Sequence, residues 1–295
     1  MTIKRPPAIV INDSTLRDVQ RYARPELSRS DRTIIARGLE KLGVAEIEFA
    51  FPSCRATAIA DLAITAAALD RAKPVLWGPA SRRTVDAAIR SGFAAVTLSV
   101  KLSSRFVGRT AVLHRITGII GHARESGLTV AICGEDASRA DFDLIRAVIA
   151  TAESAGASRF RYTDTMGVLH PLRTHSLFRE LCAETDLELE FRGHDDFGLA
   201  TANTLAAVQG GATHVSVSMV RRAAHSNTAQ LEDVVGAIRI STLHPVDVDL
   251  ALMPPLASRV ATLLGLPSAT TGRRWIPPHD AMTRGIGVSH VMGGR

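Results

Sequence analysis

The sequence predicts a (β/α)8 barrel, the TIM-barrel fold, for most of its 295 residues. Eight short apolar and β-branched runs alternate with longer segments of helical periodicity. Such alternation requires parallel strands joined by crossover helices. Glycines also stand between several of the helical segments and the strands that follow them, where a left-handed helix cap favours glycine. Eight strand–helix units within about 240 residues match a closed barrel.

The expected strands are, in order, residues 8–12, 46–49, 74–77, 95–100, 129–133, 159–163, 188–192 and 214–218. The expected helices between them are residues 31–42, 53–69, 84–91, 113–126, 141–155, 172–183 and 200–209. A doubly wound open sheet is the alternative. That fold usually carries a glycine-rich phosphate loop after its first strand, and residues 12–15 (Asn-Asp-Ser-Thr) are no such loop.

The domain organisation follows from where this alternation ends. Residues 1–245 form the barrel domain, and residues 246–295 form a short C-terminal extension that is part helical and part irregular. Within the extension, residues 253–264 have the pattern of one more helix. From residue 272 onward proline, glycine and histidine dominate, which favours a loop or an extended tail over a second domain.

Composition excludes several functional classes. No apolar stretch approaches the roughly 20 residues of a membrane span, and no apolar segment of signal-peptide length follows the N-terminus. The three cysteines are scattered and form neither a disulfide framework nor a metal-binding pair. The net charge of +6 comes from dispersed arginines, and 4% of residues are aromatic, so nucleic acid is not expected as a partner. We therefore expect a cytoplasmic protein that binds no membrane.

Polar side chains cluster where the expected strands end. In a barrel of this type, function resides at the carboxyl ends of the strands and in the loops that follow them. Carboxylates, a histidine and arginines that converge at one mouth suit the binding and polarisation of an oxyacid. The candidates are Arg17 and Asp18 after strand one, Glu48 in strand two, Glu135 after strand five, Thr165 after strand six, Arg192 and His194 at strand seven, and Ser218 in strand eight.

Four motifs make this pattern specific. They are Ile11-Asn12-Asp13-Ser14-Thr15-Leu16-Arg17-Asp18, the segment 134–141 (GEDASRAD), the segment 162–168 (YTDTMGV) and the segment 193–204 (GHDDFGLATANT). Each follows the expected strand in the expected order. Together they resemble the homocitrate, isopropylmalate and citramalate synthases of the DRE-TIM metallolyase superfamily, and most of all the homocitrate synthases of nitrogen-fixing bacteria. The resemblance runs from about residue 8 to residue 240.

The resemblance implies a Claisen condensation of acetyl-CoA, as co-substrate, with a 2-oxo acid. It implies that Arg17 stabilises the developing alkoxide, that Glu135 assists proton transfer and that Thr165 holds the oxo-acid carboxylate. Asp18 and His194 would be ligands of a divalent Mg²⁺, Mn²⁺ or Zn²⁺ ion. Arg192, Glu48 and Ser218 would contact the substrate. Family members are usually homodimers, so the resemblance also implies a homodimer.

The pattern departs from the family at Arg192. Members of the family carry two metal-binding histidines two residues apart in strand seven, and here arginine stands at the first of these positions and His194 at the second. Side chains at i and i+2 of a strand point the same way, so Arg192 should point at the metal position. An arginine has no lone pair to give a metal, so either it swings outward or the metal binds weakly or is absent.

This departure leaves three hypotheses open. The first is an acyltransferase of the synthase type, retained or retuned. The second is a catalytically degenerate barrel that binds an anionic ligand or a partner, with guanidinium groups in the place of the metal. The third is an aldolase or lyase on the same fold, which would need the same metal.

Overall fold

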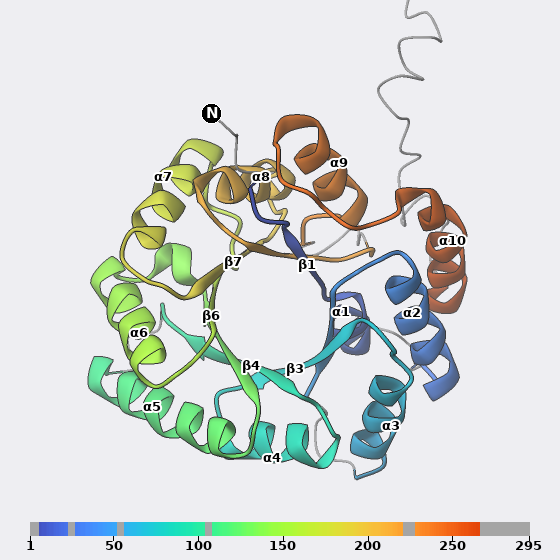
Figure 1. Ribbon diagram of the computed structural model, residues 1–295, viewed down its shortest axis with the longest axis horizontal. Coiled ribbons are helices and arrows are strands. Elements are labelled where there is room, and N and C mark those ends of the chain that lie inside the picture. Colours follow the sequence, from blue (N-terminus) through green and yellow to red (C-terminus); the bar gives the residue numbers. More distant parts are fainter. Residues whose placement is uncertain (1–5, 23–26, 52–55, 104–107, 221–227, 266–295) are drawn as a thin grey trace, which may run out of the picture.

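The computed structural model describes residues 6–22, 27–51, 56–103, 108–220 and 228–265, and it confirms the predicted closed barrel (Figure 1). All neighbouring strands are parallel, and β8 pairs with β1 to close the ring. The strands are β1 (Val10–Asp13), β2 (Glu46–Ala50), β3 (Lys73–Pro79), β4 (Ala95–Lys101), β5 (Thr129–Glu135), β6 (Arg159–Asp164), β7 (Glu188–Gly193) and β8 (His214–Val217). Each overlaps its predicted range.

Helices surround the strands on the outside (Figure 1). They are α1 (Thr15–Tyr22), α2 (Arg29–Lys41), α3 (Ala56–Ala67), α4 (Arg82–Arg90), α5 (Arg109–Glu125), η1 (Ala137–Arg139), α6 (Phe142–Ser154), α7 (Pro171–Cys182), α8 (Ala200–Gly210), α9 (Leu231–Ser241), η2 (Leu250–Leu252) and α10 (Met253–Leu264). The sequence analysis did not predict α1 and α9. The first of these matters for function, because α1 carries Arg17 and Asp18.

Local chemistry explains where several helices begin and end. Ser28 forms a capping box with Asp31 at the start of α2, and Asp141 accepts hydrogen bonds from the first backbone amides of α6. After α2 the chain turns through Gly43 with φ +93°, where a Cβ atom would lie 2.3 Å from the backbone oxygen of Asp247. Only glycine fits both the conformation and the space there.

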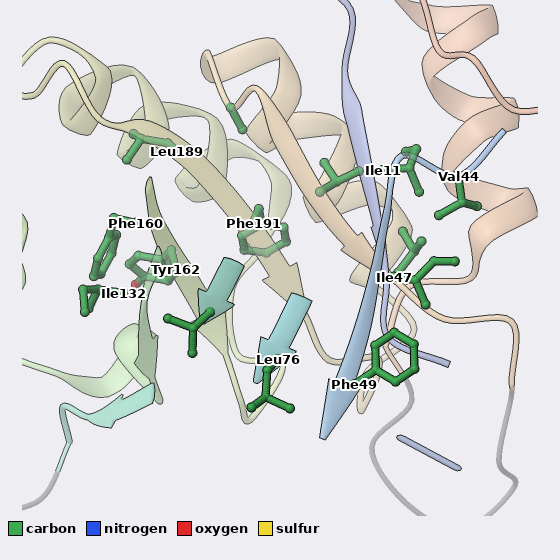
Figure 2. Close-up of a cluster of buried hydrophobic side chains, with 14 of the residues drawn as sticks. Ile11, Val44, Ile47, Phe49, Leu76, Ile132, Phe160, Tyr162, Leu189 and Phe191 are labelled. Carbon is green, nitrogen blue, oxygen red and sulfur yellow. The ribbon is translucent and has the colours of Figure 1, made fainter. Parts of the chain in front are cut away.

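The strands divide their side chains between two environments. Apolar residues alternate outward and pack against the helices, as Figure 2 shows for Ile47 and Phe49 of β2, Phe160 and Tyr162 of β6, and Phe191 of β7. The alternate residues point into the barrel. In β2, β6 and β7 many of these inward residues are charged, so the barrel interior is polar rather than filled with branched aliphatic side chains, as is common for this fold.

Ion pairs join the strands inside the barrel, some of them across the interior between strands that are not neighbours and some between adjacent strands. Arg159 of β6 donates to both carboxylate oxygens of Glu46 on β2, at 2.6 and 2.9 Å. One layer higher, Arg161 contacts Glu48 at 2.6 Å and Glu190 at 3.0 Å, and all three side chains are fully buried. A buried charge is tolerated only when it is paired, and closure of the barrel supplies these pairs.

The described part of the C-terminal extension packs on the barrel. Helix α10 lies against α2, and a Cβ atom at Gly38 would overlap the Leu256 side chain. Helix 253–264 is thus confirmed, while residues 266–295, including the predicted irregular tail, lie outside the described residues. The boundary at residue 245 stays a prediction. Within the described ranges, no helix is long and apolar enough to cross a membrane.

Candidate active site

The predicted site residues converge at the carboxyl ends of the strands. Arg17 and Asp18 lie on α1 directly after β1, while Glu48 and Glu135 come from β2 and β5. Thr165 follows β6. The three remaining candidates, Arg192, His194 and Ser218, come from β7 and from the residues directly after β7 and β8. Barrel closure therefore brings residues from six strand–loop units to one mouth.

Arg17 is held in place from several sides. Its side chain is 4% exposed, and Nη1 donates a 2.7 Å hydrogen bond to Glu48 Oε1. The guanidinium lies over the Trp77 ring, with Cζ 3.7 Å from the centroid, a cation–π contact. Glu135 Oε1 lies 4.0 Å from Nη2. Burial alone would lower the pKa of Arg17, but Glu48, Asp18 and Glu135 raise it, so the group stays charged.

One donor of Arg17 has no hydrogen-bond partner among the described residues. This donor is Nε, which is buried, and its nearest carboxylate oxygen, on Asp18, lies 4.0 Å away. A buried donor without a partner needs an explanation. Because this atom is shielded from solvent, it does not itself face a substrate; what can stabilise charge on a substrate oxygen is the preorganised guanidinium as a whole.

Glu48 links Arg17 to the interior ion pairs. Its side chain is fully buried, and its two oxygens contact Arg17 and Arg161. Burial alone would raise the pKa of Glu48, but these two arginines hold it at about 2. The sequence analysis assigned Glu48 to substrate contact. Its complete burial beneath Arg17 favours the positioning of that guanidinium instead.

Arg192 points into the barrel and does not swing outward. Its side chain is 3% exposed. Nη1 donates to the hydroxyls of Ser14 and Ser216, at 2.7 and 2.8 Å. Nη2 lies 3.1 and 3.2 Å from the two carboxylate oxygens of Asp18. Both terminal nitrogens are therefore engaged, and Asp18 has an internal cationic partner.

His194 lies behind this pair. Burial is the main reason that its pKa falls to about 4, and the positive charge of Arg192 lowers it further. The imidazole is therefore neutral at pH 7. A hydrogen bond with the backbone of Thr165 fixes the ring, as is common for histidines that bind metals.

Another side of the mouth is formed by the segments after β5 and β6. The Thr165 hydroxyl accepts a 2.9 Å hydrogen bond from the backbone amide of Asp136. Asp136 is the one non-glycine residue with positive φ among the described residues, at 59°, and Arg139 and Ser103 hold its carboxylate. Cys133 packs below Glu135, 3.5 Å from Oε1.

Two further observations define the chemistry of these loops. Burial raises the pKa of Cys133 to about 12, which argues against a thiolate nucleophile. Ser218 is 1% exposed and accepts a hydrogen bond from the amide of Val220. Its predicted contact with substrate stays a prediction.

The residues present do not fit a divalent metal. Among the described residues, no group of three or more histidine, cysteine, aspartate or glutamate side chains could hold an ion. Asp18, one of the two expected ligands, is bonded to Arg192 through both oxygens. A divalent cation about 4 Å from a guanidinium would be repelled by roughly 8 kcal/mol at an effective dielectric of 20.

Comparison with known proteins identifies the family. The HMGL-like family model matches residues 8–260, which is most of the chain and all of the described site. The chain belongs to the HMGL-like family. This confirms the resemblance to the DRE-TIM synthases that the four motifs indicated.

Individual relatives of this HMGL-like chain carry synthase names. The chain is 31% identical to homocitrate synthase 1 of Nostoc sp. over 97% of its own length and 75% of the relative. It is 28% identical to 2-isopropylmalate synthase 2 of Caldanaerobacter subterraneus, over 99% and 76%. It is 32% identical to the homocitrate synthase of Frankia alni, over 88% and 76%.

Solved structures of similar fold include an HMG-CoA lyase and a carboxyl transferase domain. The HMG-CoA lyase of Bacillus subtilis superposes with a TM-score of 0.77 over 96% of this chain and 100% of that chain, at 18% identity. The carboxyl transferase domain of Rhizobium etli pyruvate carboxylase gives a TM-score of 0.69 at 19% identity, over 93% of this chain and 50% of that chain. At such low identity these likenesses support the fold alone.

Several residues of the site were missed or undervalued by the sequence analysis. Trp77 stacks on Arg17, a contact that its position in the sequence does not indicate. Ser14, Arg161 and Glu190 were not singled out. The alternation of charged and apolar residues in 159–163 (RFRYT) and 188–192 (ELEFR) was the available signal for an inward-facing charged layer.

Proposed function

We propose that this chain condenses acetyl-CoA with a 2-oxo acid. The names of its relatives, homocitrate and isopropylmalate synthases, support this reaction class. The observation that carries the proposal is Arg17. It is anchored by Glu48 and Trp77, it stays charged, and Glu135 lies 4.0 Å from its Nη2. This arrangement suits an oxygen on which negative charge develops.

In the proposed reaction, the methyl group of acetyl-CoA gives up a proton and its carbon attacks the ketone carbon of the 2-oxo acid. A carbon–carbon bond forms, the ketone π pair moves onto oxygen, and the alkoxide takes up a proton. Water then cleaves the thioester and releases coenzyme A. Arg17 stabilises the alkoxide, and Thr165 binds the carboxylate of the 2-oxo acid. Glu135, whose Oε1 lies 4.0 Å from Arg17 Nη2, assists the proton transfer.

The test is release of free coenzyme A from acetyl-CoA. Five 2-oxo acids are tested one at a time: 2-oxoglutarate, 2-oxoisovalerate, pyruvate, oxaloacetate and glyoxylate. Each is assayed in buffer with a metal chelator and again in buffer with Mg²⁺ or Mn²⁺. Release that depends on one acid is the expected result. The R17K variant should lower kcat at least about 100-fold, because lysine lacks the directed fork. The matched variant R115K, at an exposed position on α5, should not change it.

A second candidate function is supported by a specific observation. The Arg192–Asp18 pair ties up a carboxylate that the family resemblance assigns to the metal, which favours a barrel that binds an anion without catalysis. Folded protein that releases no coenzyme A with any acid, yet gains thermal stability with one of them, would overturn the condensation and favour this second function.

A further inference from the structure

The position of Arg192 in the strand defines its relation to the metal expected for the family. Arg192 lies in β7 and His194 follows two residues later, so both side chains leave the strand on the same side. The guanidinium reaches Asp18 on α1, the other residue that the resemblance assigns to the metal. Arg192 thus leaves the strand on the side of one expected ligand and is hydrogen-bonded to the other.

The hydrogen bonds of Arg192 hold its side chain in this position. Ser14 and Ser216 come from opposite sides of the β1–β8 seam, and each hydroxyl accepts from Nη1 within 2.8 Å. The side chain is 3% exposed. Rotating it outward would take a hydrogen-bond partner from two buried hydroxyls and from the partly buried Asp18 carboxylate, which is costly.

The chemistry of Asp18 points the same way. An aspartate at a barrel mouth needs a positive partner once it is partly buried, and Asp18 is 21% exposed. In a metalloenzyme that partner is the divalent ion. Here both carboxylate oxygens lie within 3.2 Å of Arg192 Nη2. A guanidinium satisfies them with directed hydrogen bonds and cannot dissociate.

We infer that the Arg192 guanidinium replaces the divalent cation, so that the mouth of this barrel binds no divalent metal. The two other expected ligands, Asp18 and His194, are still present at the mouth. The chain therefore carries a latent metal site closed by one side chain. Opening it requires only the loss of the guanidinium and the gain of one nitrogen ligand. The inference concerns metal binding, so it can fail or hold independently of the proposed condensation.

The experiment compares three full-length proteins: wild type, R192H and R192M. The R192H change supplies an imidazole beside Asp18 and His194, which makes three ligands, the usual minimum for a protein metal site with open positions. The R192M change removes the same charge but offers no ligand of comparable strength to hard ions. Mn²⁺ binding is followed by electron paramagnetic resonance and Co²⁺ binding by its visible absorption.

Wild type should show no saturable Mn²⁺ binding up to about 1 mM, and R192M should behave alike. The R192H protein should bind at least about 100-fold more tightly, with a Co²⁺ spectrum, and the added D18N change should abolish both. If wild type binds Mn²⁺ with a Kd below about 10 μM, the inference is overturned. Equal binding by R192H and R192M overturns the latent site. If a variant does not fold, the Mn²⁺ titration of wild type alone still decides whether the native mouth binds a divalent metal.

Discussion

Replacing Glu48 with glutamine tests whether the buried ion pairs hold Arg17 in place. The carboxylate is fully buried, 2.7 Å from Arg17 and 2.6 Å from Arg161. Glutamine keeps the shape and removes the charge. Two buried guanidinium groups then share one fewer carboxylate, a change that costs about 3–5 kcal/mol in buried pairs.

The pKa of Glu48 gives an independent magnitude. Its folded value of about 2 lies well below its ordinary 4.5. At about 1.4 kcal/mol for each pKa unit, the ionised form stabilises the fold by roughly 3 kcal/mol at pH 7. Because the folded pKa is depressed, this contribution is complete above pH 4.5 and is lost as the pH falls toward 2. At pH 3 it should be roughly half or less.

The assay is urea unfolding followed by circular dichroism, at pH 7 and at pH 3. We expect E48Q to lower the free energy of unfolding by about 3–5 kcal/mol at pH 7 and by much less at pH 3. E125Q, at an exposed position on α5, should stay within about 0.5 kcal/mol of wild type. A loss below about 1 kcal/mol at pH 7, or an equal loss at both pH values, would refute the reasoning.

Two further predictions concern stability. Burial raises the pKa of Asp13 to about 7, so the folded carboxyl holds its proton where the unfolded one has lost it, and wild-type stability should fall as the pH rises from about 4 to 7. In urea unfolding, the free energy of unfolding of D13N should therefore rise relative to that of wild type by a few kcal/mol between about pH 4 and pH 7. Parallel curves of this free energy against pH would contradict the expectation. G43A should cost about 3 kcal/mol or more, because a methyl group would meet the backbone oxygen of Asp247 at 2.3 Å. G127A shares the positive φ but has open space, so thermal unfolding should show a loss of only about 1–2 kcal/mol. Equal losses would argue against the contact.

Much of the fold was available from local patterns. Eight apolar runs gave the eight strands, because an all-parallel barrel repeats one strand–helix unit with a local signature each time. Helices α1 and α9 were not predicted from these local patterns. The first is only eight residues long, which is too short for an apolar pattern to repeat over several turns.

The site divides in the same way. Four motifs located Arg17, Glu135 and His194 at the mouth, and of the two orientations that the sequence left open for Arg192 the structure has the inward one. Neither spacing nor composition could show what Arg192 contacts. Its partners Ser14 and Asp18 lie 178 and 174 residues away in the chain.

The sequence by itself determined the family, the barrel and the residues that gather at its mouth, because these depend on short-range patterns of polarity and on motifs that stay contiguous. Only the tertiary structure decided which charges meet. Arg161 pairs with Glu48 across the barrel, and Arg192 pairs with Asp18 at the mouth. The physical reason is that the partner of a buried charge is chosen by closure of the ring, where the cost of leaving it unpaired is set by residues distant in sequence.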